Sequence, residues 1–163
     1  MTNPIDIHFR TEVREEDREN IRSILVSTGF FYDIEIPVAV ELAEEHLQSG
    51  PGCGYFFIFA EVGGKTIAYA CYGPIPGTVG SYDLYWIATH DSCRGQGIGS
   101  RLIEAVHEAI VAAGGRLVIA ETSTLDKYRP TRHFYERTGY LAEARIDDFY
   151  RKGDGKVFYV KRF

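Results

Sequence analysis

The sequence lacks any apolar run that approaches the ~20 residues needed to cross a bilayer as a helix. It also lacks a Cys-x-x-Cys pair, because its three cysteines, Cys53, Cys71 and Cys93, are widely spaced. Their odd number and spacing argue against a disulfide framework, so we expect a reducing, cytoplasmic environment. Residues 1–6 contain no basic region followed by an apolar core, and we therefore expect no secretory signal.

A basic stripe and a set of metal ligands are missing as well. The formal net charge of −5 argues against nucleic acid or an anionic membrane surface as a partner. His90 and Cys93 stand close together, but no second pair of ligands stands near them, so we expect no metal site. With 163 residues, 45% hydrophobic and 25% charged, the composition is typical of one soluble domain over residues 1–163.

What the sequence does contain is a glycine-rich run between an apolar strand and a strongly helical stretch. The run consists of Arg94, Gly95, Gln96, Gly97, Ile98, Gly99 and Ser100. Glycines at alternate positions let backbone N–H groups approach a bulky anion, and the next helix adds unpaired N–H groups and the positive end of its dipole. Arg94 adds a planar cation that suits phosphate oxygens. The run predicts a pyrophosphate-binding loop, with an ordinary strand-to-helix turn as the alternative.

Two other phosphate-binding loops do not fit this run. A dinucleotide fingerprint needs glycines at its first, third and sixth positions. Starting from Gly95 the sixth residue is Ser100, and starting from Gly97 it is Leu102. A nucleoside-triphosphate loop needs a second glycine five residues after the first, followed by Lys, and neither is present.

Hydrophobic periodicity predicts one α/β unit with mixed strand directions. Gly63-Gly64 is expected to form a two-residue hairpin turn, because both residues tolerate positive φ angles. The expected helices are 15–27, 38–48, 98–113 and 130–137. The expected strands are 5–10, 55–62, 65–72, 81–89, 117–120, 140–149 and 156–162, the last two joined by a polar loop over 151–155.

This order of elements, with Arg-Gly-Gln-Gly-Ile-Gly at 94–99 and Phe-Tyr-Glu-Arg-Thr-Gly-Tyr at 134–140, resembles the GNAT superfamily of N-acetyltransferases from about residue 8 onward. The resemblance implies one mixed, mostly antiparallel sheet of about seven strands flanked by about four helices. It also implies that residues 94–100 bind the pyrophosphate of acetyl-coenzyme A (acetyl-CoA), a cosubstrate. The main chains of Ile87 and Thr89 would pair with its pantetheine arm.

The second motif departs from the superfamily pattern. Many relatives carry Asn, then Ala three residues later and Tyr seven residues later, whereas this chain has Tyr128, Thr131 and Tyr135. The resemblance implies that Tyr128 and Thr131 contact the cofactor. The three positions share one helical face if the helix extends back to residue 128.

Acetyl transfer from a thioester to an amine needs a neutral amine, stabilisation of the thioester oxygen by backbone N–H groups, and a proton for the departing thiolate. The resemblance assigns the last task to Tyr135, whose phenol has a suitable pKa. Packing of Tyr135 with Phe134 in the core is the alternative reading. Asp83 and Glu121 are the two candidates for the base, each directly or through water.

The acceptor is poorly specified by the sequence. Family analogy places two aromatic segments, 30–32 and 147–150, around its mouth, with Tyr85 and Trp86 as further candidates. Acidic residues near the second helix either attract a cationic amine or are simply solvated; they are Glu35, Glu41, Glu44 and Glu45.

The sequence thus predicts an N-acetyltransferase that moves acetyl from acetyl-CoA to a small-molecule amine, an amino acid or a peptide amine by direct transfer. The alternatives are a non-catalytic acyl-CoA-binding sensor and a transferase for a longer acyl or an aminoacyl group. Relatives are often dimers, so a homodimer stays open.

Overall fold

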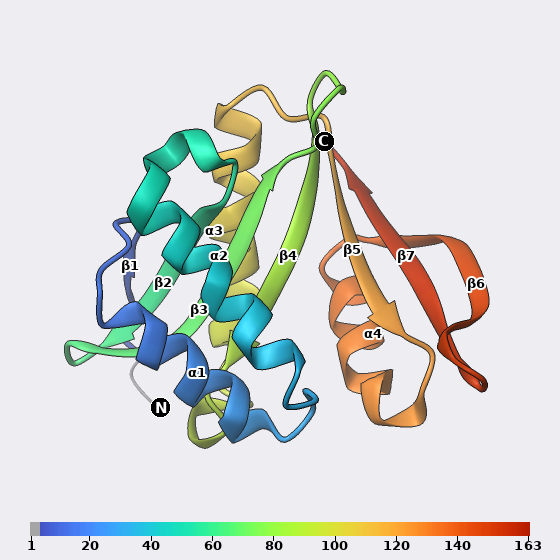
Figure 1. Ribbon diagram of the computed structural model, residues 1–163, viewed down its shortest axis with the longest axis horizontal. Coiled ribbons are helices and arrows are strands. Elements are labelled where there is room, and N and C mark those ends of the chain that lie inside the picture. The colour runs from blue at the N-terminus through green and yellow to red at the C-terminus, as the bar shows by residue number, and fades with distance from the viewer. Residues whose placement is uncertain (1–3) are drawn as a thin grey trace. The chain divides into compact units, whose positions relative to one another are not determined.

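The structure is a computed structural model that describes residues 4–163. Within this range seven strands form one sheet in the order β1-β2-β3-β4-β5-β7-β6, accompanied by four α-helices (Figure 1). Strand β4 pairs with β5 in parallel, whereas β1–β2, β2–β3, β5–β7 and β6–β7 are antiparallel pairs. The predicted α/β class, with a mixed and mostly antiparallel sheet, is confirmed.

The chain divides into two compact units. The first contains the described residues up to Tyr72 together with Trp86–Val106, and the second contains Gly73–Tyr85 and His107–Phe163. Three elements contribute residues to both units. They are β3 (Lys65–Pro74), β4 (Ser81–Thr89) and α3 (Ile98–Ala112).

In the first unit, helices α1 (Asp17–Thr28) and α2 (Glu35–Ser49) pack on strands β2 (Phe56–Val62) and β3, and β1 (His8–Arg10) pairs with β2 (Figure 1). Apolar residues at helical spacing meet alternate residues of the strands, and together they exclude water. The buried core contains Ile21, Ile24, Leu25, Ile36, Val40, Phe57, Phe59, Tyr69 and Ala88.

The hairpin between β2 and β3 turns at Gly63 (φ 58°) and Gly64 (φ 79°), as the glycine pair predicts. Both residues have the positive φ that a two-residue turn of this kind requires.

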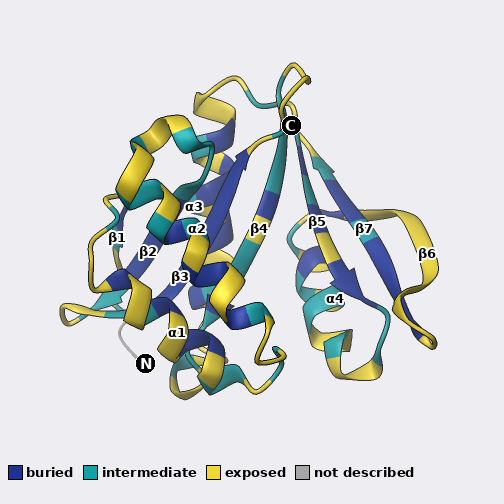
Figure 2. Ribbon diagram, in the orientation of Figure 1, coloured by how far each residue is buried: buried dark blue, intermediate teal, exposed yellow. Residues whose placement is uncertain are grey.

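In the second unit, β5 (Leu117–Ser123), β7 (Asp154–Arg162) and β6 (Leu141–Arg151) lie side by side, and α4 (Arg129–Arg137) packs against β5 and β6 (Figure 1). Every residue of β6 is exposed, whereas most of β7 is buried (Figure 2). This contrast follows from the strand order, because β6 forms the edge of the sheet and β7 lies between two strands.

Several boundaries differ from the sequence predictions by up to three residues; the first strand is only His8–Arg10, and α2 begins at Glu35. Three further differences affect elements near the predicted site residues. Strand β5 continues to Ser123, beyond the apolar run that ends at Ala120, because β7 pairs with it through its polar residues. The expected five-residue loop between the last strands is a tighter turn, since β6 ends at Arg151 and β7 begins at Asp154. Helix α4 begins at Arg129, so the helix does not extend back to Tyr128, which ends a short 3-10 turn.

Candidate functional site

The glycine-rich loop joins the first unit's part of β4 to the start of α3. Gly95 and Gly97 adopt φ angles of 74° and 76°, in the left-handed region that favours glycine. A Cβ atom built on either residue would meet nothing within 4 Å. Glycine is therefore required here for its backbone conformation, and the space in front of the loop is open.

The start of α3 is suited to a negatively charged group. The helix has 15 residues, and its first turn contains no acidic side chain that would offset the positive end of its dipole. Ile98 and Leu102 are buried and anchor this turn. The unpaired N–H groups of the first turn are thus held by a helix whose apolar face is fixed.

Arg94 is the cation of the loop, and its side chain is 44% exposed. Its Nη1 lies 3.5 Å from Asp91 Oδ1, and its guanidinium carbon lies 5.3 Å from the centroid of the Phe30 ring. The Asp91 N–H in turn donates to Ser27 Oγ over 2.9 Å. The guanidinium is therefore held from two sides while a large part of it stays accessible to an anion.

The strand that leads into the loop alternates between two environments. Ala88 is buried in the core of the first unit, whereas Ile87 and Thr89 are only partly buried. Because neighbouring strand residues point to opposite faces, Ile87 and Thr89 lie on the face away from that core. This placement is compatible with the predicted main-chain contacts at these two positions.

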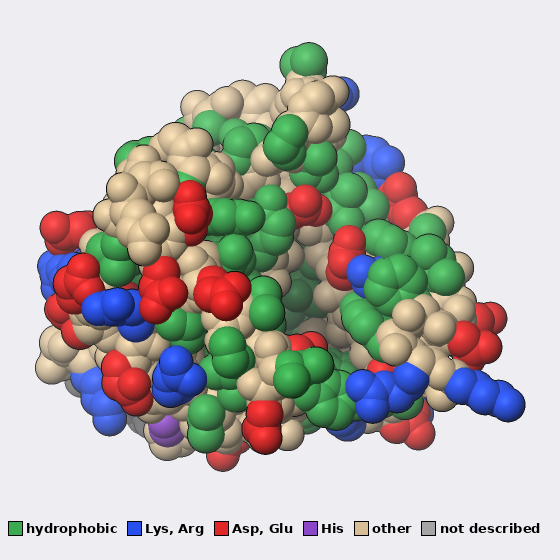
Figure 3. Space-filling view, viewed as in Figure 1, with side chains coloured by type: hydrophobic (Ala, Val, Ile, Leu, Met, Phe, Trp, Pro, Cys, Tyr) green, Lys and Arg blue, Asp and Glu red, His purple; other side chains and the backbone are tan. Residues whose placement is uncertain are grey.

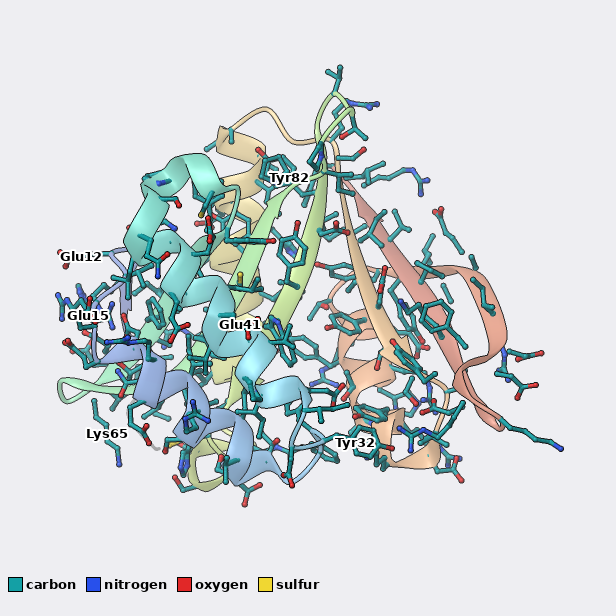
Figure 4. The ribbon with its side chains drawn as sticks, viewed as in Figure 1. Glu12, Glu15, Tyr32, Glu41, Lys65 and Tyr82 are labelled. Atoms are coloured by element: carbon teal, nitrogen blue, oxygen red, sulfur yellow. The ribbon has the colours of Figure 1, made fainter. Side chains whose placement is uncertain are left out.

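Of the residues predicted around the acceptor, segment 30–32 and Trp86 lie in the first unit, whereas Tyr85 and segment 147–150 lie in the second. Phe31 packs edge-to-face on Trp86, with ring centroids 5.3 Å apart. Figure 4 shows Tyr32 in the connection between α1 and α2, and Glu41 on α2. Acidic and basic side chains are mixed over the face formed by α1 and α2 (Figure 3), and Glu44 lies 3.9 Å from Arg18. The charged face of α2 is thus partly neutralised by its neighbours.

Tyr135 lies on α4 in the second unit and is 6% exposed. Its ring contacts those of Tyr140 and Tyr159 at centroid distances of 5.3 and 5.7 Å, and Phe134 packs on it at 5.6 Å. Burial raises the pKa of the Tyr135 phenol, so the hydroxyl stays protonated at neutral pH. Tyr135 thus packs in the core with its hydroxyl protonated, and the raised pKa makes this hydroxyl a weaker acid than a free phenol.

The candidate bases lie on the other face of the second unit's sheet. Ala120 pairs with Tyr159, on the face that α4 covers, whereas Glu121 pairs with Phe158 on the opposite face. Asp83 pairs with Ile119, which shares its face with Glu121. Within this unit, Tyr135 and the two carboxylates therefore stand on opposite sides of the strands.

The two carboxylates differ in their partners. Glu121 Oε2 accepts a hydrogen bond from Lys156 Nζ over 2.6 Å, and the two charges form an ion pair. Among residues 4–163, the Asp83 side chain forms no hydrogen bond or ion pair, although its backbone belongs to the paired strand β4. Burial raises the pKa of Asp83, Glu121 raises it further, and Lys156 opposes both effects. Asp83 thus has an increased tendency to take up a proton.

Tyr128 and Thr131 do not lie on the same helix. Tyr128 ends the 3-10 turn that precedes α4, and Thr131 is partly buried in the first turn of α4. Pro130 stands in the same turn, where its fixed φ suits the start of a helix.

Lys156 is the residue that sequence reasoning missed. It lies on β7 and is 9% exposed. The sequence gives one sign of a special role, which is a charged lysine directly before the apolar residues of β7. Its partner Glu121 is 35 residues away, and only the pairing of β5 with β7 brings the two together.

A pocket of about 450 Å³ in the second unit contains none of the predicted site residues in its lining, although Tyr159, which lines it, packs on Tyr135. It is lined by Thr124, Arg132, Ala142, Glu143, Ala144, Arg145, Val157 and Tyr159. Over residues 4–163, no three His, Cys, Asp or Glu side chains gather in a way that would hold a metal ion. No helix in the same range is long and apolar enough to cross a membrane.

Comparisons with known proteins identify the family. The model of the acetyltransferase (GNAT) domain matches residues 53–141. A Desulfovibrio desulfuricans protein assigned to the GNAT family of acetyltransferases is 46% identical, with 96% of this chain and 99% of that protein covered and a TM-score of 0.94. No protein of curated function matches the chain.

Two more distant structures share the fold. An aminoglycoside 6'-N-acetyltransferase in complex with coenzyme A is 15% identical, with 96% of each chain covered and a TM-score of 0.75. A Bacillus anthracis protein assigned as a streptothricin acetyltransferase, in complex with acetyl-CoA, is also 15% identical, with 68% of this chain and 63% of that one covered and a TM-score of 0.61. From the matched domain and the 46% identical structure, the chain belongs to the GNAT family of acetyltransferases.

Proposed function

We propose that this protein is an acetyl-CoA-dependent N-acetyltransferase that transfers acetyl directly to a primary amine while both substrates are bound. In this proposal residues 1–163 are one catalytic domain that works in the cytoplasm, as a monomer or a homodimer. The observation that carries the proposal is the open loop at 94–100, with two glycines in the left-handed region at the start of a long helix.

The loop fits the pyrophosphate of acetyl-CoA. It offers backbone N–H groups, an accessible guanidinium at Arg94 and a helix N-terminus without acidic side chains. Relatives with the same fold were crystallised with coenzyme A or acetyl-CoA, which supports this assignment. When bound, acetyl-CoA would supply an acetyl group activated as a thioester. Ile87 and Thr89 would hold its pantetheine arm through main-chain groups, and Tyr128 and Thr131 would stand along it.

Asp83 is our choice for the base. A lysine-like amine with a pKa of about 10.4 is mostly protonated at pH 7, and making it neutral costs roughly 4–5 kcal/mol. The Asp83 side chain has no hydrogen-bond partner among residues 4–163, and its raised pKa favours uptake of the proton from the amine, directly or through water. Glu121 is held by Lys156 and is the weaker candidate.

Tyr135 is our choice for the acid that protonates the departing thiolate. Its phenol is protonated and stands on the sheet face opposite to Asp83. Base and acid on opposite faces would receive and deliver protons without exchanging them with each other. This separation supports an amine that arrives from one side and a thiol that departs toward the other.

The test combines binding with turnover, using the purified full chain. Calorimetry with coenzyme A measures saturable binding, and thiol release from acetyl-CoA is followed over a panel of amines, amino acids and peptides. Mass spectrometry of the product must show one added acetyl group on nitrogen. Binding without transfer to any amine would favour the sensor function, and a complete lack of binding would overturn the assignment of the loop.

A further inference from the structure

The pocket of the second unit lies between α4 and the pair of strands β6 and β7. In the β6–β7 register, Ala142 stands opposite Tyr159 and Arg145 stands opposite Val157, so these four side chains lie on one face of the sheet. It is the face that α4 covers, since Tyr159 packs on Tyr135. The volume of about 450 Å³ falls within the range of roughly 300–1,000 Å³ that is typical of small-molecule sites.

Arg132 on α4 is held at this pocket by one end of its guanidinium group. Its Nη1 donates hydrogen bonds to the Ser123 carbonyl oxygen over 2.7 Å and to the Leu125 carbonyl oxygen over 2.9 Å. No hydrogen bond within residues 4–163 uses its Nε or Nη2. The N–H groups at these two nitrogens are parallel, and their spacing matches the two oxygens of one carboxylate. Arg132 therefore offers a two-pronged donor whose position is fixed in advance.

Arg132 also differs in its charge balance from the two other charged residues that line the pocket. Glu143 accepts hydrogen bonds from Arg162 at both carboxylate oxygens. Arg145 Nε lies 2.8 Å from Asp147 Oδ1, and the rest of the Arg145 side chain is largely exposed to solvent. In the part of the chain that the structure describes, Arg132 forms no ion pair. One negatively charged group would supply the partner that it lacks.

The remaining lining residues offer mainly apolar surface. They are Ala142, Ala144, Val157, Tyr159 and Thr124. The two polar groups among them are engaged, because the Tyr159 hydroxyl donates to Glu136 Oε1 over 3.0 Å and Thr124 Oγ1 accepts from the Gly155 N–H over 2.8 Å. The pocket thus combines one cation that lacks a partner with apolar surface beside it.

We propose that this pocket is a second ligand site, which binds a small organic carboxylate with a flat apolar body. The carboxylate accepts two hydrogen bonds from Nε and Nη2 of Arg132. The body lies against Val157 and the ring of Tyr159. Binding is reversible and breaks no bond, so the site adds to the proposed function and does not depend on acetyl transfer.

Four probes separate the two features of the ligand. They are 2-naphthoate with carboxylate and flat body, 2-naphthamide with the same body and no charge, acetate with the carboxylate alone, and 2-naphthyl phosphate. Calorimetry with the purified full chain at pH 7.5 measures each Kd. We expect 2-naphthoate to bind about tenfold or more tightly than each of the others. Equal affinity for 2-naphthamide or acetate, or tighter binding of the phosphate, would overturn the ligand class.

Two substitutions test whether the pocket is the place of binding. R132K keeps a positive charge and a donor for the two carbonyl groups but loses the fork, and should raise the Kd for 2-naphthoate by about tenfold or more. R137K is the matched control, because Arg137 lies on the same helix and does not line the pocket. A142F fills the pocket while Arg132 stays in place, and should abolish binding. An unchanged Kd in R132K or A142F would overturn the proposal.

A competition experiment separates this site from the loop at 94–100. The Kd for 2-naphthoate should stay within about twofold when coenzyme A is saturating, because the pocket lining contains no residue of that loop. Displacement of 2-naphthoate by coenzyme A would overturn the second site. Failure of the proposed function differs from this, because a protein that acetylates no amine should still bind 2-naphthoate. Circular dichroism checks the fold of each variant, and A142F supplies the test if R132K unfolds.

Discussion

The guanidinium of Arg94 lies over the ring of Phe30, with the guanidinium carbon 5.3 Å from the ring centroid. This contact links the connection after α1 to the loop that we assign to pyrophosphate. A cation–π contact at an exposed site contributes about 0.5–1 kcal/mol.

We predict that Phe30→Leu raises the Kd for coenzyme A by about two- to fivefold, because Arg94 loses the ring face that holds it. Phe30→Trp should keep wild-type affinity. Calorimetry of wild type, F30L, R94Q and F30L/R94Q gives the coupling between the two residues. Phe31→Leu is the matched control, since Phe31 packs on Trp86. Additive effects in the double variant would contradict the contact.

Gly97→Ala should weaken coenzyme A binding by roughly 5- to 30-fold, because an L-residue in the left-handed region costs about 1–2 kcal/mol. Space is not the obstacle, since a Cβ on Gly97 would meet nothing within 4 Å. Gly52→Ala serves as the control, because Gly52 has equal space and no positive φ. Equal Kd values for both variants would show that the loop conformation does not matter for binding.

Tyr135→Phe should lower kcat by about 100-fold or more, while the KM for acetyl-CoA stays within about twofold, because only the proton donor is removed. The control is Tyr159→Phe, which removes a hydrogen bond to Glu136 on the same side of the sheet. Steady-state kinetics at pH 7.5 measures both variants. Full activity in Y135F would exclude Tyr135 as the acid.

Stability should fall with pH between about 6.5 and 4 because of His107. Its Nε2 lies 2.8 Å from the Tyr140 hydroxyl oxygen, and burial, with a smaller effect from Lys161, lowers its pKa to about 4. In this range the unfolded chain binds a proton that the folded chain does not, so stability present above pH 6.5 is lost as the pH falls. We expect a loss of about 2 kcal/mol, after allowance for solvent screening.

Denaturant unfolding of wild type and His107→Gln across this pH range checks the prediction. The glutamine does not titrate, so the pH dependence of H107Q should be flatter by that amount. Parallel curves for the two proteins would assign the loss to other groups.

The parts of the fold that sequence predicted best are those set by local chemistry. The helix expected over 98–113 is α3, and Gly63-Gly64 forms the expected hairpin turn, because periodicity and positive-φ glycines act within a few residues. The family motif likewise indicates Tyr135 from its sequence neighbours alone, whereas its burial follows from the packing of α4 on the sheet.

The remaining features depend on strand register, which the sequence does not reveal locally. From the sequence, Glu121 follows the end of an apolar strand. In the structure β5 continues past it, and the pairing with β7 brings Lys156 within hydrogen-bond distance of its carboxylate. The bulge of β6 between Ile146 and Arg151, which places Phe149 over Lys156, also arises from the pairing of two strands. The distinction between Asp83 and Glu121 as bases therefore required the structure.

Strand β6 has a neighbour on one side only, and all its residues are exposed. Alternate backbone amides of an edge strand have no partner strand. In hydrogen–deuterium exchange, the outward amides of β6 should therefore exchange long before those of β7. The difference in deuterium uptake between the two strands then marks the edge of the sheet.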